Sequence, residues 1–458
     1  MSAQGQAGSA VPGLLSRDEA RALADRVLSF STADETRVNI TSELNGNTRF
    51  ADAQITTSGG GGDTSVTVTA TIGRRRASAS TNVLDDASLK RTAALAAQLA
   101  RLSPEDPELM PELGPQTYAE VGAFIDRTAD LVGETRADAV RRVVDSATET
   151  GKAAGAVFVA GFLDSHVRAI AVATSRGLFA FHRTTDADLS VTVRTPDRTG
   201  SGWSRAGSRD WGAVDPVALG RIAAQKAVAS RNPQAIEPGL YTAVLEPQAV
   251  NDLVPLLGPA FNARNADEGR SAFSKAGGGN RIGEQVVDER VTLYSDPADP
   301  NLRATPFDLE GQPVRRMVWI EKGVLRNLSY SRFWAQKQGQ QPTGAQALLG
   351  GLTLAGGTKT TAELIAGCER GVLVTHFFYI RSLDPRTVLN TGLTRDGAFL
   401  IENGKITRPL KNFRWNESPL LMLNRLDDIG RPEPTAAGRM MPALRVRNFN
   451  FASLSDAV

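Results

Sequence analysis

The side chains best suited to binding a metal or attacking a substrate are few in this sequence. Its 458 residues include three histidines, His166, His182 and His376, and a single cysteine, Cys368. A catalytic zinc ion needs three protein ligands and one open position, so these residues would have to converge from distant stretches of chain. Histidines scattered in this way are more often structural. A self-sufficient hydrolase with an unrecognised site that includes His376 stays open as an alternative.

Covalent catalysis is not indicated by the serines or by the cysteine. The segment Gly200-Ser-Gly-Trp-Ser204 lacks the strand-to-helix context of a serine nucleophile, and no Gly-x-Ser-x-Gly motif occurs. Cys368 has no histidine beside it in the sequence, which favours a small buried residue over an activated thiolate.

Composition narrows the class of protein and its partners. Apolar residues make up 41% and charged residues 22% of the chain, as in an ordinary globular protein, and the net charge is only +2. The only run of cations, at 74–76, has no interleaved aromatic residues. We therefore expect no nucleic-acid partner and no anionic membrane partner.

Three further features predict the cellular compartment of the protein. A lone cysteine suits a reducing compartment. No window approaches the ~18 consecutive apolar residues of a membrane span. Residues 1–15 have neither a basic start nor an apolar stretch, so we expect a short disordered lead and not a signal peptide. A cytoplasmic location follows as the expectation.

The first half of the chain predicts an α+β domain over residues 16–235. Ser16 and Glu19 form a capping-box signature for a helix at 17–30. Alternating stretches rich in Val, Ile and Thr predict an antiparallel sheet with a turn at Asn45-Gly46 and a mobile glycine tip around Gly59–Gly62. Further helices are predicted at 86–102, 117–131, 136–150 and 215–229, and further strands at 155–163, 168–174, 178–184 and 188–194.

The second half, residues 236–458, predicts a β-rich domain with a barrel-like sheet. Proline and glycine at 232–239 mark the boundary between the domains. A helix-like segment at 247–265 precedes strands predicted at 286–294, 314–320, 324–330, 371–379 and 438–446 and a hairpin predicted at 398–406.

The order of sequence segments in this second half resembles that of the TldD/PmbA family. TldD-type members carry a zinc-binding His-Glu-x-x-x-His helix shortly before a Ser-x-Phe element, which here is Ser271-Ala-Phe273. The corresponding helix positions read Val254-Pro-Leu-Leu-Gly-Pro259, so Val254, Pro255 and Pro259 stand where two histidines and a glutamate are expected. The family's cysteine falls near Thr435-Ala-Ala-Gly-Arg-Met-Met441, which contains none. The chain is therefore similar to the TldE (PmbA) partner subunit, which lacks the zinc motif.

The resemblance implies that this chain binds no catalytic metal itself. In TldD-type relatives, zinc lowers the pKa of a bound water that attacks a peptide; here we expect no bound cofactor and zinc only in a TldD-type partner. The implied role is a non-zinc subunit of a peptide-degrading or peptide-maturing complex, as a heterodimer with that partner or as a homodimer. A groove in the C-terminal domain would hold extended peptide, with Ser271, Phe273, His376, Phe377 and Phe378 as its candidate residues. A stand-alone peptide-binding or scaffold homodimer is the alternative from another class.

Overall fold

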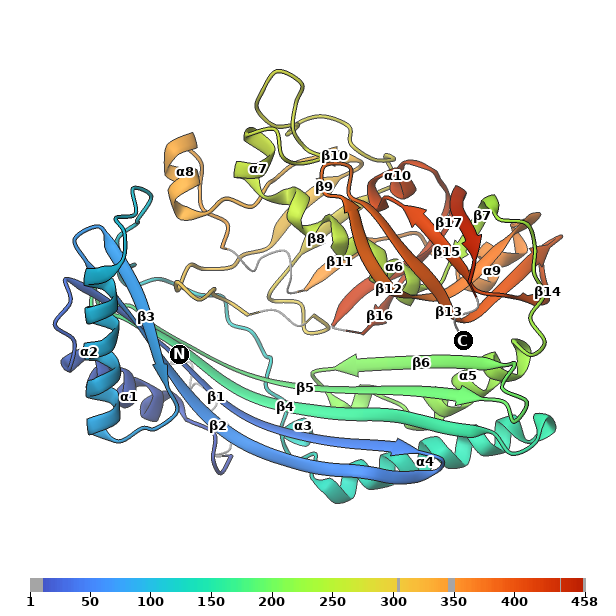
Figure 1. Ribbon diagram of the computed structural model, residues 1–458, viewed down its shortest axis with the longest axis horizontal. Coiled ribbons are helices and arrows are strands. Elements are labelled where there is room, and N and C mark those ends of the chain that lie inside the picture. The colour runs from blue at the N-terminus through green and yellow to red at the C-terminus, as the bar shows by residue number, and fades with distance from the viewer. Residues whose placement is uncertain (1–10, 303–304, 345–350, 437, 456–458) are drawn as a thin grey trace, which may run out of the picture.

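The computed structural model describes residues 11–302, 305–344, 351–436 and 438–455. A long curved sheet forms the N-terminal part, and a β-rich C-terminal part covers much of its concave face (Figure 1). The predicted α+β fold class is therefore confirmed. The elements of the N-terminal part are α1 (Arg17–Ser29), β1 (Glu35–Ala51), β2 (Gln54–Ile72), β3 (Arg75–Thr81), α2 (Asp86–Leu102), α3 (Asp126–Ala129), α4 (Gly133–Gly151), β4 (Phe158–Thr174), β5 (Phe179–Arg194), β6 (Ser201–Ser208) and α5 (Pro216–Ala229).

The N-terminal sheet is antiparallel and has the strand order β3-β2-β1-β4-β5-β6 in the described residues. The predicted turn at Asn45-Gly46 is wrong: β1 runs straight through it, and the chain reverses at Asp52 and Ala53, both with positive φ. The predicted glycine tip is wrong too, because residues 59–62 lie within β2 and pair with residues 44–47.

A close approach explains one of these glycines. A Cβ on Gly46 would lie 2.2 Å from Nη1 of Arg136. The Arg136 guanidinium is buried there, with Nε donating to the Thr48 hydroxyl at 3.2 Å and Nη1 to the Leu131 carbonyl at 2.7 Å. Gly46 therefore makes room for a side chain of α4, and not for a turn.

Helices cover the convex face of this sheet. α4 and α5 pack on it through Val143, Ala147 and Ala223, which share a core cluster with Leu189 of β5, while α1 and α2 pack at the opposite end of the sheet. Of the helix predicted at 117–131, only the short α3 forms, because the backbone before it is hydrogen-bonded to β5. Thr185 N–H donates to the Ala123 carbonyl, and Ile125 N–H donates to the Thr185 hydroxyl.

The C-terminal part contains a partly closed sheet. Its elements are β7 (Gly239–Leu245), α6 (Pro247–Leu253), the 3-10 stretch Val254–Phe261, α7 (Ala263–Asp267), β8 (Thr292–Ser295), β9 (Met317–Glu321), β10 (Val324–Leu325), α8 (Arg332–Gln338), β11 (Leu352–Ala355), α9 (Thr361–Ala366), β12 (Arg370–Asp384), β13 (Leu389–Glu402), β14 (Lys405–Leu410), β15 (Phe413–Glu417), α10 (Pro419–Asn424), β16 (Leu426–Thr435) and β17 (Arg439–Leu454). In the described residues, β7 pairs with both β12 and β17, so the order β7-β12-β13-β15-β17 closes on itself. This closure is the expected barrel-like sheet.

The helix-like segment expected over 247–265 is interrupted. It divides into α6, a 3-10 stretch and α7. Proline has no backbone N–H to donate and clashes with the preceding turn, so Pro255 and Pro259 prevent a continuous α-helix.

Residues 230–238, between α5 and β7, link the two parts of the chain. Gln234 in this linker forms two backbone hydrogen bonds beside β14: its N–H donates to the Pro409 carbonyl, and its carbonyl accepts the Lys411 N–H. Of the lead expected over residues 1–15, residues 1–10 lie outside the described residues, and Leu14 is buried with Val167 and Ala169. No helix in the described residues is long and apolar enough to cross a membrane.

Candidate functional site

One carboxylate joins the two parts of the molecule. On β13, Asp396 accepts a hydrogen bond from the Ser201 hydroxyl of β6, and its other oxygen lies 3.0 Å from Nε2 of His376 on β12. All three residues are buried. Burial by itself would raise the pKa of Asp396, but the hydrogen bonds from His376 and Ser201 outweigh it and hold that pKa below its ordinary value.

The histidine ring in this trio is also packed against an aromatic residue. The Trp203 ring lies 4.3 Å from the His376 ring, centroid to centroid. Because the Ser201 hydroxyl donates to Asp396 and not to the imidazole, the three residues do not form a nucleophile and base pair. Their geometry is that of a bridge between β6 and the β12–β13 pair.

A second carboxylate connects α6 to β12. Asp252 accepts the Phe377 N–H at 2.8 Å with one oxygen and the Gln248 side-chain amide at 2.8 Å with the other. Burial raises the pKa of Asp252 above its ordinary value, despite these hydrogen bonds. The helix α6, which directly precedes Val254, Pro255 and Pro259, is thus bonded to the strand that carries His376.

The five candidate groove residues occupy different surroundings. Ser271 is buried and donates to the Ala260 carbonyl at 2.6 Å, and Phe273 and Phe377 lie in the hydrophobic core. His376 is buried in the bridge described above. Only Phe378, which is 44% exposed, presents its side chain to solvent. The groove formed by these five residues stays a prediction, and Phe378 is the one of them that a bound peptide could contact in this conformation.

The positions aligned with zinc ligands do not fit a metal ion. Val254 is fully buried, Pro255 is half-buried and Pro259 is exposed, and none of these side chains has a donor atom. Cys368 is buried, and burial raises the pKa of its thiol. Within the described residues, no group of three or more His, Cys, Asp or Glu side chains is placed to hold a metal. Residue 437, in the segment aligned with the family's cysteine, lies outside them.

An open sheet edge lies beside the bridge. In the described residues, β7 pairs with β12 only at 371–374, and no other strand pairs with that side of β12. The strand beyond carries exposed Phe378, Tyr379 and Leu383. Arg395 stacks over the Phe378 ring at 4.2 Å, and Tyr379 has a φ of 54°. Beyond the Phe377 N–H, which Asp252 accepts, the edge therefore combines backbone without a strand partner in the described residues with exposed aromatic side chains.

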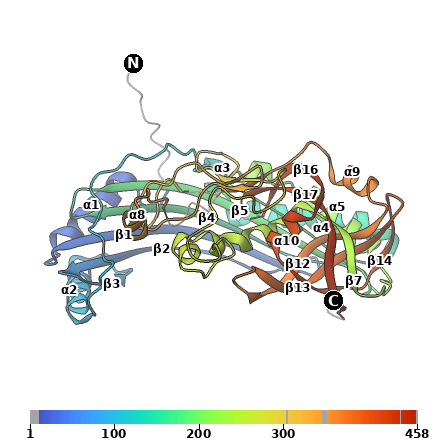
Figure 2. The same cartoon turned by 90° about the horizontal axis from the view of Figure 1, so that it is seen from above.

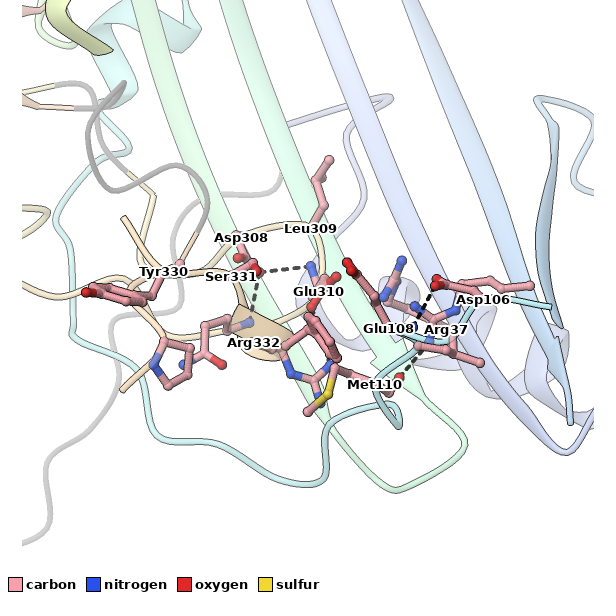
Figure 3. A pocket seen from close by; sticks show the side chains of 16 residues that line it. Arg37, Asp106, Glu108, Met110, Asp308, Leu309, Glu310, Tyr330, Ser331 and Arg332 are labelled. Atoms are coloured by element: carbon pink, nitrogen blue, oxygen red, sulfur yellow. Dashed lines mark hydrogen bonds and ion pairs between the residues drawn. The ribbon is translucent and has the colours of Figure 1, made fainter. Parts of the chain in front are cut away.

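Cavities occur where the two parts meet. One, of 520 Å³, is lined by Ser201, Ser230, Asn232, Asp396 and Lys411 among others. Another, of 490 Å³, lies where the 106–110 segment meets the loops around Asp308 and Ser331, with Arg37 and Arg332 on its walls (Figure 3). The cations there are already paired: Arg37 and Arg76 share the buried Glu112, and Arg332 faces Glu310.

The family models identify the class of protein to which this fold belongs. The PmbA/TldA metallopeptidase central domain matches residues 123–231, and the PmbA/TldA metallopeptidase C-terminal domain matches residues 238–453. The chain belongs to the PmbA/TldD family.

Curated relatives match parts of the chain. A protein described as a metalloprotease from Methanothermobacter thermautotrophicus is 27% identical over 226 residues, which is 46% of this chain and 47% of that protein. A TldD homologue described as a metalloprotease from Haemophilus influenzae is 29% identical over 144 residues, 29% of each chain. The matched regions thus span about half the length of these relatives or less.

Solved structures match nearly the whole fold. TldE from Thermococcus kodakarensis has a TM-score of 0.78 at 19% identity, covering 94% of this chain and 99% of that one. A candidate modulator of DNA gyrase from Bacteroides thetaiotaomicron has a TM-score of 0.81 at 22% identity, covering 95% and 99%. At these identities the likeness concerns the fold.

Sequence reasoning missed the partners that give His376 its surroundings. Ser201, Trp203 and Asp252 lie far from His376 in the chain, and no local motif marks them. Asp396 stands beside Gly397, which indicates a turn and not a buried carboxylate. Only tertiary structure brings these residues together.

Proposed function

We propose that this chain is a TldE-like subunit, without zinc of its own, of a peptidase complex whose catalytic zinc is held by a TldD-like partner. The observation that carries the proposal is the pairing of a metallopeptidase fold with Val254, Pro255 and Pro259 at the metal positions. The complex would degrade or mature peptides. Its place in the cell would be the cytoplasm, which suits a chain with one buried cysteine.

The chain's contribution would be substrate binding and assembly. Extended peptides can add as a strand to an open sheet edge, where main-chain hydrogen bonds supply affinity with little demand on sequence. The side of β12 beyond Phe377, which pairs with no strand in the described residues, offers such an edge, with Phe378 and Tyr379 exposed beside it. This edge supports peptide binding by the chain.

The test compares the chain alone, a zinc-bearing TldD-type relative alone, and the two co-expressed. Metal per chain is measured by elemental analysis, and cleavage of an unfolded peptide by mass spectrometry. We expect zinc in the relative, co-purification of the two chains, and faster cleavage by the pair. Stoichiometric zinc and full peptidase activity in the isolated chain would contradict the proposal.

A stand-alone peptide-binding homodimer is the second candidate, and the open β12 edge favours it as well. The same preparations separate the two functions. Peptide affinity without cleavage, unchanged by the zinc-bearing relative, together with a homodimeric mass in solution, would select the binding protein.

A further inference from the structure

A polar cavity lies where the two parts of the molecule meet the linker between them. Its volume is 520 Å³, which is within the range of sites for small ligands. Arg198, Ser201, Asn232, Asp396 and Leu410 are among the residues that line it, and we call it the linker cavity. It lies towards the end of the molecule that carries β14 and α5, whereas α1 and α2 stand at the other end (Figures 1 and 2).

Asp396 brings a buried negative charge to the linker cavity. The hydrogen bonds described above hold its pKa below the ordinary value despite burial, so the carboxylate is ionised at neutral pH. One oxygen accepts from the Ser201 hydroxyl, and the other lies 3.0 Å from Nε2 of His376. Nε of Arg395 is 3.8 Å from that second oxygen, beyond hydrogen-bond range. A carboxylate has about four lone-pair sites, so about two remain for a donor inside the cavity.

Arg198 brings a positive charge to the same cavity. It is exposed, and within the described residues its guanidinium has neither an ion pair nor a hydrogen bond. The adjacent Asp197 is already neutralised by Arg231, whose Nη2 and Nε donate to one of its oxygens at 2.8 and 3.1 Å. The third charged residue of the lining, Lys411, is also a cation. The linker cavity therefore combines one buried carboxylate with cations.

This combination of charges selects the class of ligand. An anion such as phosphate would be attracted by Arg198 but repelled by Asp396, and a polyamine would meet the reverse. A molecule with one ammonium and one carboxylate group can form a charge-assisted hydrogen bond with each. Apolar contacts are available as well, because Pro233, Ala398 and Leu410 line the cavity.

We propose that the linker cavity binds a short peptide with both ends free, such as a dipeptide. Its terminal ammonium donates to Asp396, and its terminal carboxylate accepts from Arg198 and from the side-chain amide of Asn232. Two residues of extended chain span about 7 Å, which suits a cavity of this volume. Dipeptides are end products of peptide degradation, so the ligand would be a product of the proposed complex, but its binding requires neither zinc nor the TldD-like partner.

The test uses the full chain and three ligands. Alanylalanine has both charged ends, N-acetyl-alanylalanine lacks the ammonium, and alanylalanine amide lacks the carboxylate. Titration calorimetry should show that alanylalanine binds at least about tenfold more tightly than either blocked form. Because a ligand of the folded chain stabilises it, alanylalanine should also raise the melting temperature more than the blocked forms do. No binding of alanylalanine, or equal affinities for the three ligands, would overturn the proposal.

A substitution at the exposed Arg198 tests the site without disturbing the core. Arg198→Gln should weaken binding of alanylalanine about tenfold and leave binding of alanylalanine amide unchanged, because the amide lacks the group that Arg198 binds. Arg142→Gln, at an exposed arginine of α4, is the matched control and should change neither affinity. Full affinity for alanylalanine in Arg198→Gln would contradict the proposed site.

The β12 edge is the other place at which a peptide could bind, and Phe378→Ser separates the two sites. Since Phe378 does not line the linker cavity, this change should leave alanylalanine binding intact. Binding lost in Phe378→Ser but kept in Arg198→Gln would overturn the inference while leaving the proposed function in place. Failure of the chain to associate with a zinc-bearing relative would instead remove the proposed function and leave dipeptide binding unaffected.

Discussion

His376 on β12 and Asp396 on β13 lie side by side, with Nε2 and Oδ2 3.0 Å apart, and the same carboxylate is held from the other sheet by Ser201. The imidazole also stacks against Trp203 of that sheet. His376 is therefore part of the contact between the two parts of the molecule, and its substitution would alter how they are held together.

Asp396→Ala should destabilise the protein because it leaves the buried His376 ring and the Ser201 hydroxyl without their shared acceptor. The expected loss in the free energy of unfolding is about 2–4 kcal/mol, and Ser201→Ala should cost about 1 kcal/mol. Urea denaturation measures both. Ser382→Ala, at an exposed position of β12, is the control, and a cost for Asp396→Ala no larger than the control's would contradict the bridge.

Gly202→Ala should be severely destabilising, because β6 and α5 touch at this residue. A Cβ there would lie 2.2 Å from the Ala223 carbonyl oxygen and 2.4 Å from the Ala227 nitrogen, both backbone atoms. We expect a loss of more than about 3 kcal/mol in unfolding free energy. Gly61→Ala is the matched control: Gly61 also lies in a strand, a Cβ added to it would meet no other atom within 4 Å, and its cost should stay within about 0.5 kcal/mol. Similar melting temperatures for the two variants would refute the close packing.

The stability of the protein should fall as the pH is lowered from about 6.5 to about 4, in part because of His182. Burial and the neighbouring Arg209 lower the pKa of His182 to about 4. The unfolded chain therefore binds a proton in this range that the folded chain does not, which stabilises the unfolded state. His182→Gln should reduce the pH dependence of the unfolding free energy by roughly 3 kcal/mol across this range.

His166 supplies the control of opposite sign. Its pKa is raised, chiefly by a hydrogen bond with Asp164 and also by one with Glu43. Its protonation stabilises the folded chain, fully below the unfolded pKa of about 6.5, and the effect is lost as the pH rises through the folded value. His166→Gln should therefore leave the decline towards pH 4 in place. A decline that persists unchanged in His182→Gln would disprove the assignment.

Phe378→Ser should weaken peptide binding, whereas Phe377→Ser should lower the stability of the protein. Phe378 is largely exposed at the open edge, so its replacement should weaken binding of an extended peptide about tenfold with little change in melting temperature. Phe377 stacks in the core with Trp415 and Phe449, so its replacement should cost about 3–5 kcal/mol of stability. Titration calorimetry and thermal melts distinguish the two; peptide affinity unaffected by Phe378→Ser would exclude this edge as the peptide site.

Local patterns were enough to predict the elements whose own residues determine them. The capping box of Ser16 and Glu19 forms as expected at the start of α1, and Asp215 with Pro216 begins α5. The predicted turn at Asn45-Gly46 and the predicted helix at 117–131 were wrong because distant groups decide the local structure. Arg136 occupies the space over Gly46, and Thr185 takes the backbone hydrogen bonds of residues 123–125.

The candidate site was predictable only in part. The absence of donor atoms at Val254, Pro255 and Pro259 can be read from the sequence once the family is recognised. The sequence also identifies His376 as a candidate site residue. The bridge to Asp396 could not be predicted, since it depends on β6 meeting β13 through two residues that are 195 positions apart in the chain. Burial likewise separated Phe377 from its neighbour Phe378, because adjacent residues of a strand face opposite sides.

The two prolines that divide the segment between α6 and α7 also limit how the chain could change. Replacing Val254 and Pro259 by histidine would place one imidazole in the apolar interior and the other at the surface, and the intervening turn would still follow a tighter helical path. Point substitutions alone would therefore not recreate a metalloenzyme from this protein. In the proposed complex, reliance on another polypeptide for hydrolysis would be built into the backbone and would persist through ordinary side-chain variation.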